Sequence, residues 1–158
     1  MSRVNYTQLA ADPFKKFYEF SNTLKHPSYG ETIRGLVDIR VSQINGCAFC
    51  LDMHSKEAKI RGERELRLYH VAIWRESPLF DAREKAALAW AETLTEVADG
   101  GVPDAAYEAA RAHFSEQELS ELTFAVVAIN GWNRLSIAFA NTPGSQDKLF
   151  GLDKAGLN

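Results

Sequence analysis

The two cysteines of this chain and one of its histidines lie within a single short stretch, INGCAFCLDMH, residues 44–54. Cys47 and Cys50 form a Cys-x-x-Cys pair, and His54 follows four residues after Cys50. Successive helical residues turn by about 100°, so Cys50 would lie about 60° and His54 about 20° from Cys47 around the helix axis. The spacing therefore predicts that two sulfurs and an imidazole share one face of a helix.

The expected position of this helix favours thiol chemistry. Asn45-Gly46 should end the preceding helix, which puts Cys47 in the first turn of the next one. Unpaired amide N–H groups and the helix dipole at that end can lower a thiol pKa from about 8.5 into the range of roughly 3.5–7.5. One thiolate could then attack an electrophile, and the other could resolve the product into a disulfide. The i, i+4 position of His54 favours Cys50 as attacker, Cys47 as resolver and His54 as base or relay.

Three other interpretations of the pair stay open at this point. Two thiolates and an imidazole could be three ligands of a zinc ion, with a water or a carboxylate such as Asp52 as the fourth, although no second Cys or His cluster follows. A permanent disulfide would close a very short loop, where the stabilisation is smallest. The cysteines could also be small buried hydrophobic residues.

The composition is that of a soluble globular protein. The chain has 158 residues, 46% of them hydrophobic and 25% charged, and a formal net charge of −3 without a basic run, so neither nucleic acid nor an anionic membrane is an expected partner. The first twenty residues lack the continuous apolar core of a secretory signal. The most apolar stretch, 122–140, contains Asn130, Gly131, Asn133 and Arg134, which favours a buried core helix over a membrane span. We expect a cytoplasmic protein whose thiols are mostly reduced.

Apolar residues recur at helical spacing along most of the chain, and no alternating strand pattern or hairpin dipeptide appears. The sequence predicts one all-α domain over residues 1–158, a bundle of about six to eight helices with a core at about 14–142 and a loosely ordered tail at 143–158. Asp81 is expected to be an N-cap, and the segment SEQE at 115–118 is a capping-box pattern. The predicted helices are 14–24, 30–45, 47–61, 63–74, 82–98, 105–114 and 116–141.

One short pattern occurs twice. Ile-Asn-Gly stands at residues 44–46, before the cysteine pair, and again at 129–131, each time after an apolar helical segment. In the second copy, Trp132 and Leu135 occupy the positions that correspond to Cys47 and Cys50. The repeat is compatible with an ancient doubling of a helical hairpin and equally with chance.

The segment RVSQINGCAFCLDMHSKEAKIRGE resembles the core motif of alkylhydroperoxidase D-like (AhpD-like) proteins of the carboxymuconolactone decarboxylase superfamily. The segments RLYHVAIWRESPLFDAREKAALAWAETLT and AINGWNRLSIAF are also similar to that family, so the likeness runs from about residue 14 to 142. The resemblance implies an all-α fold, a homotrimer or homohexamer, no cofactor, and peroxidase or disulfide-reductase chemistry. It also implies a hydroperoxide substrate, an external dithiol or lipoyl-bearing reductant, Cys50 as attacking sulfur, Cys47 as resolving sulfur and His54 in the proton relay.

Two departures from the family pattern bear on that relay. The family often has a glutamate twelve residues before the first cysteine, where this chain has Gly35, and some members have a histidine where this chain has Phe49. Another carboxylate would have to complete the relay. Glu84 is our candidate, and the alternatives are Asp38 and Asp52. Lactone decarboxylases of the superfamily generally lack the cysteine pair, which argues against decarboxylation.

Two functions from different classes follow. The first is a thiol-dependent peroxidase whose Cys47–Cys50 pair cycles between dithiol and disulfide. The second is a non-catalytic oligomeric redox sensor or scaffold, which the missing relay glutamate keeps open.

Overall fold

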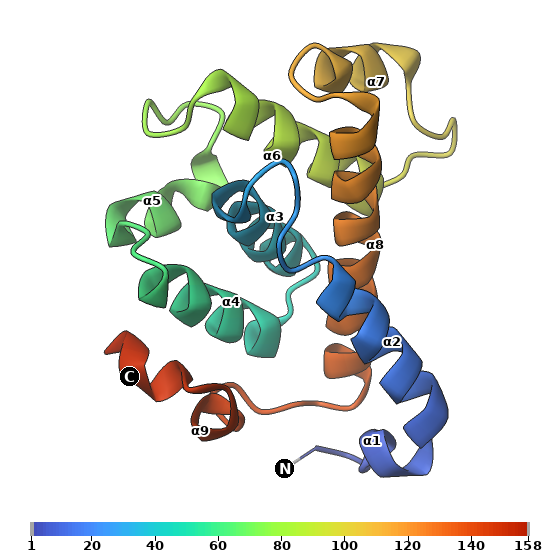
Figure 1. The fold of residues 1–158 in the computed structure, drawn as a ribbon, viewed down its shortest axis with the longest axis vertical. Helices are drawn as coiled ribbons and strands as arrows, with labels where there is room; N and C mark the ends of the chain where they lie inside the picture. The colour runs from blue at the N-terminus through green and yellow to red at the C-terminus, as the bar shows by residue number, and fades with distance from the viewer. Residues whose placement is uncertain (1, 158) are drawn as a thin grey trace.

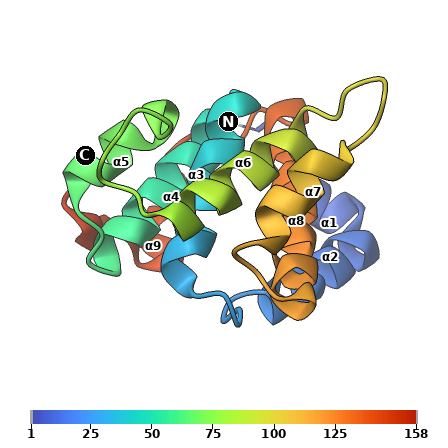
Figure 2. The same ribbon diagram turned by 90° about the horizontal axis from the view of Figure 1, so that it is seen from above.

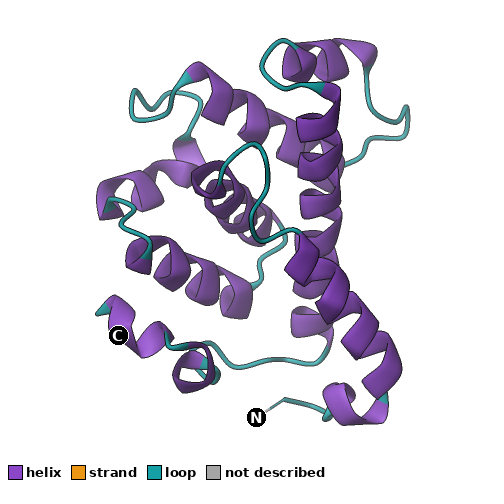
Figure 3. Cartoon of the chain, viewed as in Figure 1, coloured by secondary structure: helices purple, strands orange, loops and turns teal. Residues whose placement is uncertain are grey.

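Helices make up the ordered secondary structure of the chain, as the sequence predicts. The computed structural model describes residues 2–157, and within that range it contains nine α-helices and two short 3-10 helices, with no strand beyond an isolated Ala98–Gly101 bridge (Figure 3). Of the α-helices, α1 and α9 are single turns, so seven longer ones remain. In chain order the helices are α1 Tyr6–Leu9, α2 Ala11–Thr23, α3 Glu31–Ile44, α4 Ala48–Ile60, α5 Glu65–His70, η1 Val71–Ile73, α6 Ala82–Thr95, α7 Asp104–Arg111, α8 Glu116–Ala138, α9 Asp147–Phe150 and η2 Leu152–Ala155.

Local capping sets two of the helix starts. The Asp81 side chain accepts the Glu84 N–H, and the Glu84 side chain accepts the Asp81 N–H, which completes a capping box before α6. Ser115 and Glu118 form the same reciprocal pair before α8. Each box satisfies two N–H groups that a helix start otherwise leaves unpaired. Both predicted N-caps are therefore confirmed.

The helices are arranged around α3 and α8. Helix α3 packs against α4, α6 and α8, and much of its length is buried. Figures 1 and 2 show the long α8 beside this group, with α2 on the side of α8 away from α4 and α5. The ring of Trp132 on α8 lies 4.5 Å from that of Phe17 on α2, and its indole N–H donates to Ser21 at 2.7 Å. The apolar stretch at 122–140 thus belongs to a core helix, as predicted, and no helix within residues 2–157 is long and apolar enough to span a bilayer.

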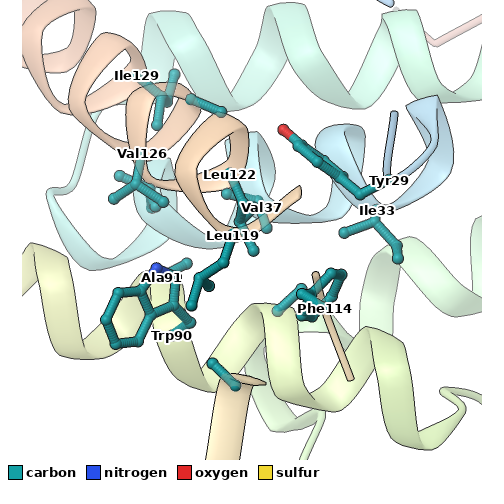
Figure 4. Packing of buried hydrophobic residues seen from close by; sticks show 14 of the residues in the cluster. Tyr29, Ile33, Val37, Trp90, Ala91, Phe114, Leu119, Leu122, Val126 and Ile129 are labelled. Carbon is teal, nitrogen blue, oxygen red and sulfur yellow. The ribbon is translucent and has the colours of Figure 1, made fainter. Parts of the chain in front are cut away.

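One apolar cluster joins α3, α4, α6, α7 and α8, and it contains both cysteines. Figure 4 shows part of it, with Val37 of α3 between Leu122 of α8 and Ile33. Cys47 and Cys50 are buried at the edge where α4 begins. The cysteine pair is therefore held by the core of the bundle. Other buried members of the cluster are Tyr29, Val41, Ala87, Trp90, Ala91, Ala110, Phe114, Leu119, Ala125, Val126 and Ile129.

The expectation of a loosely ordered tail is wrong. After Pro143 the chain forms α9 and η2, which lie below α4 in Figure 1, and Leu152 is buried against it. The Lys56 ammonium of α4 donates to Asp147 at 2.7 Å and to Asp52 at 2.9 Å. The tail is thus held against α4 by an ion pair between residues ninety-one positions apart in the sequence and by the burial of Leu152.

Candidate active site

The two sulfurs lie together at the start of α4. Cys47 is the N-cap residue, and its Sγ accepts the backbone N–H of Cys50 at 3.3 Å, as a capping hydroxyl would. The two thiol groups are also within hydrogen-bond distance of each other, with 2.8 Å between the two Sγ atoms. Both are free thiols, 2% and 3% exposed. The structure thus contains the predicted pair at a helix start, within reach of disulfide formation.

The contacts of the pair make its two thiols unequal. The hydrogen bond from the Cys50 thiol, with help from the backbone N–H and the nearby His54, lowers the pKa of Cys47 to about 7 although burial opposes this. The same hydrogen bond, together with burial, raises the pKa of Cys50. The first proton lost by the pair therefore leaves its negative charge on Cys47. The sequence pattern had favoured Cys50 as the more activated thiol.

His54 lies near the pair, but its ring is hydrogen-bonded to Glu57 and not to a cysteine sulfur. Its Nδ1 is 2.8 Å from Glu57 Oε2 and 3.9 Å from Asp38 Oδ2, and among the described residues the ring makes no hydrogen bond with either sulfur. Burial would lower the pKa of His54, but the two carboxylates outweigh it and raise that pKa. The raised pKa shifts His54 toward its protonated form, and a positive charge at this position lowers the pKa of Cys47.

Of the three carboxylates that the sequence offers for a relay, Asp38 approaches His54, at 3.9 Å from Nδ1, whereas Glu84 is bonded elsewhere. The buried Asp38 on α3 also accepts two hydrogen bonds from Arg34 Nε at 2.8 and 2.9 Å. Glu84 is committed elsewhere, since its carboxylate bonds the Arg67 guanidinium at 2.5 Å and the Asp81 N–H at 3.0 Å. We correct the choice of Glu84 on this ground. The sequence carried a usable signal, because Asp38 stands one helical turn after Gly35, on the same face of α3.

Asp52, the other alternative, is also occupied. Its carboxylate bonds Lys56 at 2.9 Å and the backbone N–H of Gly144 at 3.0 Å. Asp52 therefore holds the C-terminal tail against α4 and makes no contact with His54 among the described residues.

Helix α8 supplies two polar neighbours that the sequence analysis missed. Hydrogen bonds from Ser136 and Asn133 partly offset the factors that raise the pKa of Cys50, and Ser136 also helps to lower that of Cys47. Asn133 is fully buried, and it bonds Ser42 at 3.1 Å and Asn45 at 2.9 Å. The only hint in the sequence was the group of polar residues inside the apolar stretch at 122–140.

The repeated Ile-Asn-Gly segments meet in space. The Asn45 side-chain amide donates to the Asn130 side-chain oxygen at 2.9 Å. In the first copy the chain breaks between α3 and α4, whereas the second copy lies inside the continuous α8. The contact ties the loop that carries Cys47 to α8, and the origin of the repeat by duplication stays a hypothesis.

The described residues do not provide a complete set of ligands for a zinc ion. Among residues 2–157, no three His, Cys, Asp or Glu side chains are grouped so that they could hold a metal ion. The Nδ1 atom of His54 faces carboxylates.

With the fold and the cysteine pair in place, comparison with known proteins is informative. Residues 12–93 match the Carboxymuconolactone decarboxylase family, a match that covers α2 to α6 and includes the cysteine pair. The chain belongs to this family. The chain is also similar to the uncharacterized protein YdfG of Bacillus subtilis, with 40% identity over 144 residues, which are 91% of this chain and 98% of YdfG. YnjA of Escherichia coli is 39% identical over 107 residues, which are 68% of this chain and 56% of YnjA.

Solved structures place the chain more narrowly within the family. ATU0492 of Agrobacterium tumefaciens, a protein of unknown function whose name suggests the antioxidant defence protein AhpD, superposes with a TM-score of 0.86 at 38% identity, over 90% of this chain and 98% of that one. A peroxidase-related protein from Silicibacter has the same fold, with a TM-score of 0.77 at 23% identity over 86% of this chain and 72% of that one. The chain is therefore an AhpD-like member of the carboxymuconolactone decarboxylase family, as the sequence resemblance implied.

Proposed function

We propose that this AhpD-like protein is a thiol-dependent peroxidase that reduces hydroperoxides with the Cys47–Cys50 pair. The observation that carries the proposal is the 2.8 Å contact between the two sulfurs at the start of α4, in which one thiol has a pKa lowered to about 7. A thiolate at neutral pH and a second thiol in contact with it are the two requirements of a dithiol peroxidase. The likeness to ATU0492 supports the same assignment.

The reaction balances with the groups that the site contains. A thiolate sulfur attacks one peroxide oxygen, the O–O bond breaks, and the leaving alkoxide takes a proton to become an alcohol. The other thiol then displaces hydroxide from the sulfenic acid, which forms the disulfide and, with its proton, releases water. An external dithiol, of the lipoyl type, returns the pair to the reduced state by thiol–disulfide exchange.

The identity of the attacking sulfur is part of the proposal. The family resemblance implies attack by Cys50, and the 2.8 Å contact allows its proton to pass to Cys47, which moves the negative charge to the attacking atom. His54, held by Glu57 and Asp38, supplies positive charge beside the pair and is our proposed relay residue. Asp38 replaces Glu84 as the carboxylate that we propose for this relay.

Burial of the two thiols limits the size of the substrates that can reach them. Cysteines that are 2–3% exposed favour small hydroperoxides over bulky ones, and a reductant must gain access through local opening.

We further propose a cytoplasmic homotrimer or homohexamer with no nucleic-acid or membrane partner. The exposed apolar side chains of Leu66, Tyr69 and Ile73, which follow one another along α5 and η1, support assembly. Sedimentation velocity on the reduced protein tests it, and a monomer would contradict it.

Single-cysteine variants test the enzyme assignment. C50S should abolish hydroperoxide turnover with a dithiol donor, because the sulfur that we propose as the attacker is gone and no Cys47–Cys50 disulfide can form. C47S should react once and stop at a sulfenic acid on Cys50 that has no partner to resolve it. Turnover assays and mass spectrometry after one equivalent of peroxide measure both outcomes, with A48S as a control substitution in the same turn.

The variants also separate the two assignments of the sulfurs. A sulfenic acid that forms on Cys47 in C50S, and none in C47S, would transfer the attacking role to Cys47. Wild-type turnover in both variants would contradict the peroxidase proposal.

A redox sensor is the second candidate, favoured by the burial of both sulfurs. In that case oxidation would change the size of the assembly while peroxide turnover stays absent. Comparing the sedimentation of oxidised and reduced protein with turnover in the same preparation distinguishes the two functions.

A further inference from the structure

A hollow lies where α3, the end of α4 and the start of α5 meet, and neither cysteine lines it. It has a volume of about 580 Å³, within the usual range for a small-molecule site. Gly35 and Leu36 of α3 and Ala58 of α4 line it, and Arg61 and Arg64 from the connection between α4 and α5 complete its wall. None of these residues has a place in the proposed peroxide chemistry.

Two of the guanidinium groups in this hollow have no directly bonded anionic partner among residues 2–157. Among residues 2–157, the side chains of Arg61 and Arg64 make no ion pair and no hydrogen bond, although eight other arginines of the chain do. The third guanidinium, that of Arg67, is neutralised by Glu63 and Glu84. The two guanidinium groups therefore have no ion-pair partner in direct contact, although the charge of Arg61 acts at longer range on Glu57 and lowers its pKa.

The carboxylates in the wall do not cancel them. Glu63 bonds Arg67 at 2.9 Å, and Glu31 bonds the His26 ring at 2.6 Å. The Glu63 carboxylate also accepts the backbone N–H of Arg64 at 2.8 Å, but neither carboxylate forms an ion pair with the guanidinium of Arg61 or Arg64. The hollow thus retains two free donors of the planar, bidentate type that suits carboxylates and phosphates.

Gly35 explains how Arg61 comes to lie there. Gly35 is buried in the interior of α3, where its backbone is ordinary helix, and glycine at such a position is destabilising relative to alanine. A Cβ atom at this position would be 3.1 Å from Arg61 Nη2, so the glycine leaves the space that the guanidinium occupies. Because residue 35 has no side chain, the Arg61 guanidinium can lie against α3 in the hollow.

We propose that this hollow binds a small organic oxyanion, a carboxylate or phosphate on a compact apolar body. Arg61 anchors the anionic group and Arg64 contributes the second charge. Leu36 and Ala58 pack against the apolar part. The inference is independent of the peroxidase proposal, because binding here uses neither sulfur.

Calorimetric titration of the reduced full chain with benzoate, phenyl phosphate and neutral benzamide tests the site. One or both anions should bind saturably, and benzamide should bind at least tenfold more weakly. A preference for benzoate assigns a carboxylate ligand, and a preference for phenyl phosphate assigns a phosphate ligand. No saturable binding in the millimolar range, or equal binding of benzamide, would overturn the proposal.

Three variants of the hollow and one control variant locate the binding. R61Q and R64Q should each weaken the preferred anion by about tenfold, while K25Q, which removes the same charge from an exposed residue outside the hollow, should leave affinity unchanged. G35E should remove binding altogether, since its carboxylate would occupy the hollow and pair with Arg61. Circular dichroism and thiol counts confirm that each variant is folded. Wild-type affinity in R61Q and R64Q, or equal weakening in K25Q, would show that the hollow is not the site.

Discussion

The chemistry of the site depends on where one proton lies between two sulfurs. Cys47, as N-cap, accepts the backbone N–H of Cys50, and once Cys47 is deprotonated its sulfur can also accept the Cys50 thiol. The negative charge of the singly deprotonated pair therefore rests on Cys47, with His54 nearby. The two thiols differ because a helix start leaves backbone N–H groups unpaired, and the first cysteine of a Cys-x-x-Cys pair lies where its sulfur can accept one of them. The second cysteine supplies that N–H and also a thiol that can donate to the first sulfur.

The thiol pKa gives a test at this scale. Thiolate absorbance at 240 nm should rise with a midpoint near pH 7 in the reduced protein. The sign is that of an acid with a lowered pKa: the thiolate predominates above pH 7 and the thiol below it, so peroxide consumption should increase as pH rises through 7. C50A removes the donor and should move the midpoint up toward about 8.5, the value of a free cysteine. An unchanged midpoint in C50A would mean that the Cys50 thiol does not set the pKa.

At the scale of elements, the site depends on how three helices meet. Helix α4 carries the sulfurs and His54, α3 brings Asp38 to the imidazole, and α8 adds Asn133 and Ser136. Helix α2 in turn packs on α8 through the rings of Phe17 and Trp132. Gly131 makes this packing possible, since a Cβ there would lie 2.5 Å from Phe17 Cζ.

A double-mutant cycle measures that packing. G131A should lower the free energy of unfolding by about 1 kcal/mol, because overpacking costs about 1–3 kcal/mol and the higher helix propensity of alanine returns about 1. In an F17A background the clash is absent, so the same change should be neutral or stabilising. Urea unfolding of the four proteins gives the coupling. Equal effects of G131A in both backgrounds would contradict the contact.

At the scale of the whole molecule, the C-terminal tail completes the cover of α4. Lys56, buried on α4, pairs with Asp52 on its own helix and with Asp147 at the start of α9. Leu152 and Ala155 then pack into the body of the protein. The tail is therefore part of the folded unit that supports the helix with the cysteines.

Removal of the Lys56 charge tests the role of the tail. K56M should lower the free energy of unfolding by about 1–2 kcal/mol, less than a fully buried pair would cost because its carboxylates keep 21–28% exposure. Amide exchange should accelerate at residues 144–157 more than in α3. K16M, which breaks an exposed pair with Asp12, is the matched control and should cost less than about 0.5 kcal/mol. Equal costs in the two variants would show that the tail adds no stability through Lys56.

The sequence by itself determined the features that arise within a few residues of one another. The helices, the two capping boxes and the position of Cys47 and Cys50 at a helix start all follow from contacts of three or four residues, which spacing reveals directly. The family resemblance was available from the same local motif.

Only the tertiary structure decided which distant groups face the site. Asp38 meets His54, Asn133 reaches the cysteine loop, and Lys56 holds Asp147, all through contacts between separate elements. Glu84 was a reasonable choice by sequence, but in the folded chain its carboxylate forms an ion pair with the Arg67 guanidinium. Charged and polar side chains find partners wherever the packing of helices brings them, and that packing depends on the whole core.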